Sequence, residues 1–178
     1  MKLAINHQTR RVLGWSAIKI LSLFVSKGTK VLVTKGRAEK EKQYFTEYDP
    51  ILPDIPLAVL INNSSASASE IVAGALQDLD RAVLLGQKSF GKGLVQTTSY
   101  LGYDNYAKIT TAKYYIPSGR CIQAVKYSSD GKPVMLPDSL QKEFTTKNGR
   151  RVYDGGGISA DVVTKVDYLS SFTAARRR

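Results

Sequence analysis

The chain has 178 residues, of which 43% are apolar, so it can bury one hydrophobic core, and nothing in it suggests a second independent domain. Its 26 basic and 15 acidic residues give a formal net charge of +11, which favours anionic partners. The basic residues are spread out and do not alternate with aromatic residues in a compact stripe, so a solvated basic surface is the simpler interpretation, and nucleic-acid binding is not expected. The single cysteine, Cys121, excludes an internal disulfide framework.

The amino-terminal segment predicts neither an export signal nor a membrane anchor in this chain. Its first five residues are followed by a polar run at residues 6–11, which leaves no apolar signal core of the usual length. The more apolar residues 18–25 are too few to span a bilayer.

A helix and a strand are predicted before residue 50. The apolar residues of segment 15–25 recur at roughly helical spacing, with Gly28 just past the end as a C-cap. Residues 31–34 then predict a strand, and residues 35–42 a charged, solvated turn.

A strand, a helix and a second strand are predicted next. Residues 57–61 form a short apolar run typical of a buried strand, and a serine-rich turn leads into a helix that begins near Ser67. Residues 82–85 are a second apolar run, ended by Gly86. Two strands joined through a helix are expected to lie parallel, so their carboxyl ends share one sheet edge, where ligand sites of α/β proteins gather.

The remaining chain predicts mostly strands and turns. Residues 94–100 and 107–116 are rich in β-branched and aromatic residues and predict a β-hairpin. Another short strand is expected near residues 122–125, and the chain from there to residue 154 is expected to be polar and irregular.

Ser67 has two competing interpretations. With Glu70 three residues later it fits a capping box, which satisfies the free donors at a helix start and needs no function. Alternatively, its hydroxyl attacks a carbonyl while free N–H groups at the helix start hold the developing oxyanion. The sequence physics alone leaves both open.

A nucleophilic serine needs a base, and the only histidine, His7, lies far upstream without supporting context. A lysine serves when burial or positive neighbours lower its pKa. Lys92 stands between Gly91 and Gly93, after an apolar strand, a setting that suits a partly desolvated amine. If the following residues are extended, Gln96 points the same way and can orient Lys92.

A phosphate-binding loop is an alternative for residues 86–93, which match the pattern of glycine, four residues, glycine and lysine. Gly93, however, stands where serine or threonine should bind magnesium. The residues that follow favour a strand, whereas a phosphate loop opens a helix, so this alternative fits poorly.

Three segments resemble the carboxyl-terminal processing peptidases, also called tail-specific proteases: SASASEIVAGALQD at residues 65–78, FGKGLVQ at 90–96 and TAKYYIPSGR at 111–120. The likeness runs from about residue 22 to residue 163, and the first two motifs with their spacing are highly specific. The resemblance implies that Ser67 is the nucleophile, Lys92 its general base and Gln96 the residue that orients Lys92. It also implies an oxyanion donor at the backbone N–H of Ala68 and a structural role for Asp78.

The resemblance further implies a crotonase-like or ClpP-like α/β core, with β-α-β units and an additional β-hairpin region. It predicts a serine endopeptidase that cleaves protein or peptide substrates near their carboxyl ends through an acyl-enzyme, without metal or cofactor. A homo-oligomer is left open, and the cell envelope or periplasm of a bacterium is the expected location. The whole chain, residues 1–178, is expected to be one partial peptidase core without a PDZ domain.

Two features depart from the family pattern. Relatives carry a segment with two adjacent glycines before the first helix, which is expected to complete the oxyanion hole, and residues 3–14 do not fit it. Ala160 stands where the family has proline before the aspartate that corresponds to Asp161. We therefore expect a fragment or an altered start, and the alternative function is a catalytically impaired domain that only binds peptides or other subunits.

Overall fold

The computed structural model describes residues 2–4, 14–37, 40–128, 130, 133–135 and 137–165. Two helices and twelve strands occur in these ranges, together with one 3₁₀ turn at Asp138–Leu140. In chain order the elements are β1 (Lys2–Ala4), α1 (Gly14–Ser22), β2 (Lys30–Gly36), β3 (Lys42–Phe45), β4 (Ala58–Ile61), α2 (Ala68–Asp78), β5 (Val83–Gly86), β6 (Leu94–Gly102), β7 (Asn105–Tyr115), β8 (Val125–Tyr127), β9 (Pro133–Met135), β10 (Glu143–Thr145), β11 (Arg151–Tyr153) and β12 (Val162–Val163).

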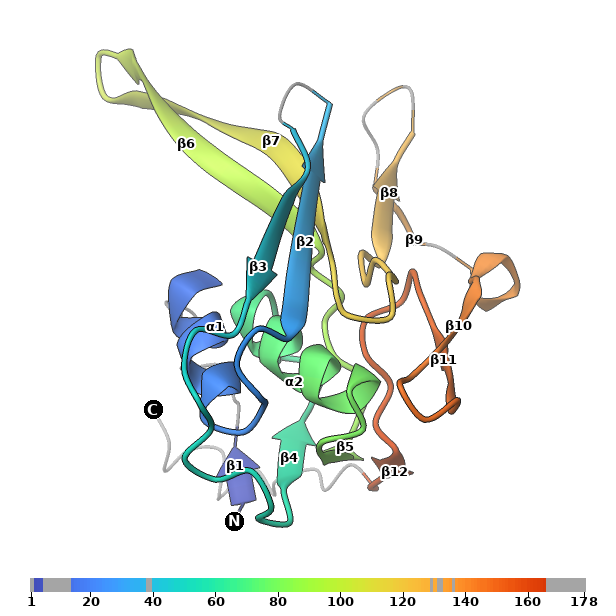
Figure 1. The fold of residues 1–178 in the computed structure, drawn as a ribbon. Coiled ribbons are helices and arrows are strands. Elements are labelled where there is room, and N and C mark those ends of the chain that lie inside the picture. Colours follow the sequence, from blue (N-terminus) through green and yellow to red (C-terminus); the bar gives the residue numbers. More distant parts are fainter. Residues whose placement is uncertain are drawn as a thin grey trace, which may run out of the picture.

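A parallel sheet with the strand order β1-β4-β5-β12 forms one layer of the molecule (Figure 1). β4 and β5 pair in parallel, with Val59 opposite Leu84, and α2 connects them. The predicted β-α-β unit is therefore confirmed, and the carboxyl ends of β4 and β5 lie at the same sheet edge.

Helix α2 is enclosed on all sides. All eleven of its residues are buried, and α1 packs against it. A Cβ atom built on Gly74 would lie 2.7 Å from the Cδ1 atoms of both Ile116 and Ile158, so only glycine lets these side chains approach the helix so closely. The helix that starts at Ser67 thus forms the centre of the core.

A second, antiparallel sheet has the order β3-β2-β7-β6. Its β6–β7 hairpin, which the sequence predicts, projects from the body of the molecule (Figure 1). The base of this hairpin lies against the core through the buried side chain of Tyr114, so the strand that follows Lys92 is fixed to the body.

Two sequence predictions are wrong in their details. Helix α1 ends at Ser22 instead of residue 25, and the N–H groups of Leu23 and Phe24 bond carbonyls only three residues back, as in a turn, at 3.1 and 3.0 Å. Residues 122–124, predicted as part of a strand, lie before β8 instead: the N–H of Ala124 donates to the Gly91 carbonyl at 2.9 Å, and the Ile122 carbonyl accepts the N–H of Gly157 at 2.9 Å.

Other strands were not predicted. β3 lies where the sequence indicated only a charged turn and its exit, and β10 pairs with β11 in the stretch expected to be irregular. These strands are short and mostly exposed, so they have little apolar periodicity to reveal them.

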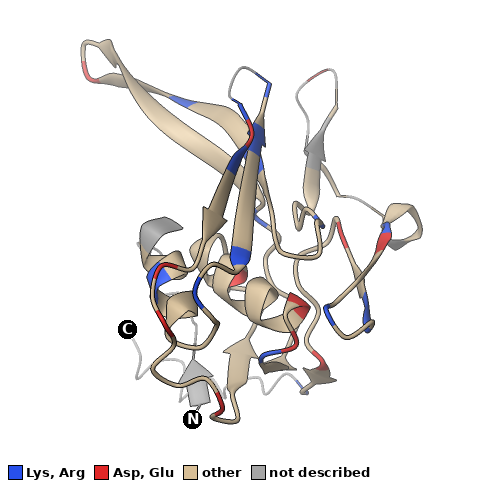
Figure 2. Cartoon of the chain, viewed as in Figure 1, with Lys and Arg blue, Asp and Glu red and all other residues tan. Residues whose placement is uncertain are grey.

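Lysine and arginine residues lie on several separate elements (Figure 2), in agreement with a distributed basic charge. None of the helices in the described part of the chain is long and apolar enough to cross a membrane. His7 and most of the segment that departs from the family pattern, residues 5–13, lie outside the described residues.

Candidate active site

Ser67 occupies a strained turn between β4 and α2. Its φ of 58° and ψ of −116° lie in a region that non-glycine residues rarely adopt and that costs about 1–3 kcal/mol. A helix-capping serine ordinarily has β-region angles, so capping alone does not explain this strain. A sharp strand-to-helix turn of this kind is also how hydrolases expose a nucleophilic serine.

The backbone N–H of Ala68 follows directly, at the first position of α2. The first N–H groups of a helix have no partner within the helix and carry partial positive charge. This end of α2 is therefore chemically suited to receive an oxyanion formed next to Ser67.

The carboxylate of Glu70 joins the serine turn to the lysine loop. Its Oε2 atom accepts the N–H of Ser67 at 2.8 Å and the N–H of Lys92 at 2.9 Å. Its Oε1 atom accepts the N–H of Gly91 at 2.7 Å and the hydroxyl of Ser89 at 2.5 Å. One side chain thus holds the backbones of both candidate catalytic residues.

Glu70 is fully buried, and this burial raises the pKa of its carboxyl group. The hydrogen bonds from Ser89, Lys92, Gly91 and Ser67 act in the opposite direction and favour the ionised form. Such a buried acid is tolerated only because each oxygen receives two donors.

Tyr114 of β7 holds the same two residues from the other side. Its hydroxyl donates to the carbonyl oxygen of Lys92 and lies 3.4 Å from the carbonyl oxygen of Ser67. Burial raises the pKa of Tyr114 well above its ordinary value, so its hydroxyl keeps the proton that it donates.

The loop that carries Lys92 is fixed along its length. Gly91 has a φ of 86°, and a Cβ atom there would lie 2.5 Å from the Cβ atom of Ala124, so the position requires glycine. The N–H of Gly93 donates to the side-chain oxygen of Gln123 at 2.7 Å. Lys92 itself is half-buried between these anchors.

The structure brings the backbones of Ser67 and Lys92 together at the predicted sheet edge. Gln96 lies on β6, where its side-chain amide donates to the hydroxyl of Thr110 at 3.3 Å, and its orienting role toward Lys92 stays a prediction. β6 begins two residues after Lys92, so a strand follows this loop, as the sequence indicates, where a phosphate loop would open a helix.

Two residues of the site were missed or underrated from the sequence. Glu70 was predicted only as a capping partner, and Tyr114 was not singled out. The available signal for Glu70 was its position in a helix whose other early residues are small or apolar, where an acid must find several donors.

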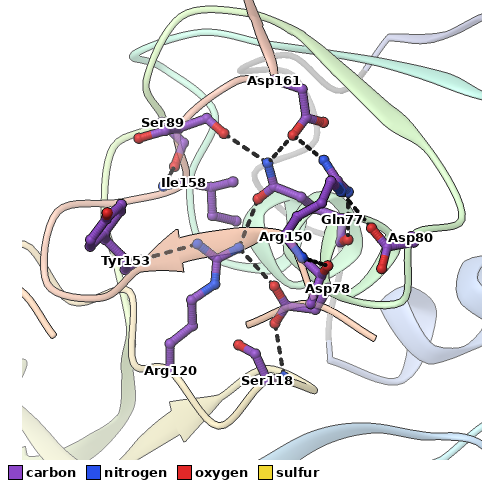
Figure 3. A network of polar contacts seen from close by, with 12 residues as sticks. Gln77, Asp78, Asp80, Ser89, Ser118, Arg120, Arg150, Tyr153, Ile158 and Asp161 are labelled. Carbon is purple, nitrogen blue, oxygen red and sulfur yellow. Dashed lines mark hydrogen bonds and ion pairs between the residues drawn. The ribbon is translucent and has the colours of Figure 1, made fainter. Parts of the chain in front are cut away.

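The carboxyl end of α2 is held by a second polar network (Figure 3). Arg120, which is 2% exposed, places Nη2 at 2.9 Å from Oδ1 of Asp78 and 2.7 Å from Oε1 of Gln77. The other Asp78 oxygen accepts the N–H of Ser118 at 3.0 Å. These contacts support the structural role expected for Asp78.

Arg150 and Asp161 extend this network at the surface (Figure 3). Arg150 pairs with Asp80 at 2.5 Å and with Asp161 at 2.7 Å. Asp161 also accepts the N–H of Leu84 in β5 at 2.7 Å. The carboxyl-terminal segment is thereby attached to both α2 and the parallel sheet.

Across residues 2–4, 14–37 and the described ranges from 40 to 165, no three histidine, cysteine, aspartate or glutamate side chains lie together in an arrangement that could hold a metal ion.

Residues 13–132 match the model of Peptidase family S41, and the chain belongs to this family. Among curated proteins it is similar to the carboxy-terminal-processing protease of Bartonella bacilliformis, with 45% identity over 115 residues that cover 64% of this chain and 26% of that protein. It is also similar to carboxyl-terminal-processing peptidase 1, chloroplastic, of Arabidopsis thaliana, with 39% identity over 131 residues that cover 73% of this chain and 27% of that protein.

The fold has a counterpart among solved structures. A structure described as a photosystem II D1 C-terminal processing protease superposes with a TM-score of 0.65 at 25% identity, covering 92% of this chain and 34% of that one. The mixed α/β architecture is therefore that of family S41, and the chain spans about a quarter of the length of the curated relatives described here.

Proposed function

We propose that this chain is the catalytic core of a serine endopeptidase that cleaves protein substrates near their carboxyl ends. Ser67 is the nucleophile and Lys92 its general base. One observation carries the proposal: a single oxygen of Glu70 receives the N–H groups of both residues, at 2.8 and 2.9 Å. A fixed relation between nucleophile and base is what covalent catalysis needs.

In the proposed reaction, the neutral amine of Lys92 takes the Ser67 hydroxyl proton as the serine oxygen attacks the scissile carbonyl. The resulting oxyanion is stabilised by the N–H of Ala68 at the start of α2. Lys92 then protonates the leaving amine, and the acyl-enzyme remains. Water, deprotonated by Lys92, attacks this ester, and Lys92 gives the proton to the departing Ser67 oxygen as the second product leaves.

Glu70 and Tyr114 serve as positioning residues, because they bind the backbones of Ser67 and Lys92 and do not touch the substrate in this mechanism. Gln96 is proposed to orient the Lys92 amine by accepting one of its N–H groups at the side-chain carbonyl oxygen, while the amide nitrogen donates to Thr110. The reaction needs no metal and no cofactor in this scheme.

Several wider features belong to the same proposal: a single core domain of the crotonase-like or ClpP-like type, protein or peptide substrates, and a cell envelope or periplasmic location. The names of the relatives, which are carboxyl-terminal processing proteases, support the substrate class. A domain that only binds partners is not favoured, because binding alone gives no reason for a strained serine held beside a glycine-flanked lysine.

Peptide cleavage tests the proposal. A denatured protein substrate is incubated with the chain, and the products are sequenced by mass spectrometry. Ser67→Ala and Lys92→Ala should each lower kcat by at least roughly a hundredfold, because the first removes the nucleophile and the second removes its general base. Ser64→Ala and Lys108→Ala, at exposed positions, are the matched controls and should cleave normally. Normal turnover in Ser67→Ala or Lys92→Ala would refute the dyad.

A further inference from the structure

A cavity of about 630 Å³ lies beside the segment that follows Lys92. This volume is within the range of ligand-binding pockets, roughly 300–1,000 Å³. Its apolar lining comes from Leu94, Tyr115, Val125 and Leu140, which belong to β6, β7, β8 and the 3₁₀ turn. Elements far apart in the sequence therefore build one surface that can take an apolar side chain.

The cavity adjoins the proposed catalytic loop. Leu94 stands two residues after Lys92, and Gln123, which lines the cavity, accepts the N–H of Gly93 at 2.7 Å. Thr110, the partner of Gln96, lines it as well. A peptide bound at the catalytic residues would therefore have neighbouring side chains within reach of this cavity.

The charged side chains that line the cavity carry a net positive charge. Lys113 and Lys142 both line the cavity, against one carboxylate, that of Asp154. An Asp154 oxygen already accepts the backbone N–H of Lys142 at 2.8 Å. Neither ammonium group forms an ion pair with any residue that the structure describes.

We propose that this cavity is a substrate subsite that binds a peptide carboxylate next to an apolar side chain. Lys113 and Lys142 attract the carboxylate, and the four apolar residues pack against the neighbouring side chain. The carboxylate belongs either to an acidic side chain or to the free end of the chain. This subsite rests on the proposed peptidase function, for which it defines the substrate class.

Cys121 provides a test that needs no cleavage. It lines the cavity, is partly exposed, and is the only cysteine of the chain. Burial raises the pKa of its thiol, so alkylation by iodoacetamide is followed at pH 9, where more of the reactive thiolate is present. The rate is measured by intact-protein mass spectrometry in the Ser67→Ala variant, with increasing concentrations of short leucine-containing peptides.

Four peptides show which carboxylate protects Cys121 from alkylation. The first pair is a peptide with a free carboxyl end and the same peptide as its amide. The second pair is a peptide amide with an internal aspartate and the same amide with asparagine in that place. We expect either or both carboxylate peptides to slow the alkylation several-fold and the two neutral peptides to protect much less. Which of the two carboxylate peptides protects tells whether the chain end or the side chain is bound. Equal protection by the neutral amides, or no protection by any peptide, would overturn the proposal.

Lysine variants add a second readout. Lys113→Gln and Lys142→Gln should each weaken protection by the carboxylate peptide roughly two- to fivefold, as expected for partly exposed charge pairs. Lys108→Gln lies on the same strand outside the cavity and is the matched control. An unchanged affinity in both Lys113→Gln and Lys142→Gln would also overturn the proposal.

Cleavage by the unmodified chain is measured in parallel and decides the proposed function by itself. Cleavage without Cys121 protection leaves the dyad standing and removes the subsite. Protection without cleavage supports the subsite and counts against the peptidase.

Discussion

At the scale of single residues, Glu70 does more than a helix cap requires. A capping acid binds the N–H at its own helix start, whereas Glu70 also binds the N–H groups of Gly91 and Lys92. The capping pattern was visible in the sequence. The bonds from Gly91 and Lys92 were not visible, because these two N–H donors are more than 20 residues away in the sequence. They meet Glu70 only once β5 has paired with β4.

Glu70→Gln tests this role. Whichever way the glutamine amide lies, its NH₂ group faces at least one backbone N–H, so a buried donor loses its acceptor. We expect a loss of about 1–3 kcal/mol in the free energy of unfolding, together with a lower kcat for peptide cleavage. Urea denaturation and cleavage kinetics measure the two effects. Glu41→Gln, at an exposed acid, is the control, and an equally small effect of both changes would contradict the role.

Tyr114→Phe tests the second positioning residue. The change removes one hydroxyl and leaves the carbonyl oxygen of Lys92 without this donor, so we expect a loss of roughly 1 kcal/mol in stability. If the hydroxyl positions Lys92, kcat falls while KM changes little. Tyr106→Phe, at an exposed position on the same strand, should alter neither quantity.

At the scale of elements, α2 is held at both ends. The sequence predicted where it begins, because the serine-rich turn is followed by a run of mostly small and apolar residues, as expected for a helix that fills the core. The partner of Asp78 could not be predicted, since Arg120 comes from a separate loop beyond β7 and its approach depends on the tertiary fold. The direction of the Gln96 side chain could not be predicted either. The strand register shifts between Val95 and Gln96, and such irregularities are not visible in residue patterns.

Asp78→Ala should destabilise the chain by about 3–5 kcal/mol, because it leaves the Arg120 charge buried without its carboxylate partner. The double variant Asp78→Leu/Arg120→Met should recover part of this loss, since it removes both charges. Urea denaturation measures both. Glu143→Ala removes an exposed pair with Arg151 and should cost less than about 1 kcal/mol. A similarly small effect of Asp78→Ala would show that the network does not hold α2.

At the scale of the whole molecule, strands with an apolar run or many β-branched and aromatic residues were predictable, and the short exposed strands β3, β10 and β11 were not. β4 and β5 are visible in the sequence as apolar runs. β3, β10 and β11 have no such run, and each is recognised only by its pairing with a neighbouring strand. The net charge likewise gives no function by itself, because lysine and arginine are distributed over several elements (Figure 2).

From this charge distribution we predict how the chain binds nucleic acid. Binding to a DNA duplex should be weak, independent of sequence and steeply reduced by salt, as expected for contacts with phosphates alone. Fluorescence anisotropy at low and physiological salt measures it. Sequence-dependent affinity that persists at physiological salt would contradict the distributed basic surface.

The most direct test of the account is covalent labelling of Ser67 by an acylating serine probe, with the labelled residue identified by mass spectrometry. We predict modification at Ser67 in the unmodified chain, none at that position in Ser67→Ala, and a strongly reduced rate in Lys92→Ala, while Lys108→Ala labels normally. Labelling of Ser67 at an undiminished rate in Lys92→Ala, or no labelling of Ser67 in the unmodified chain, would contradict the account.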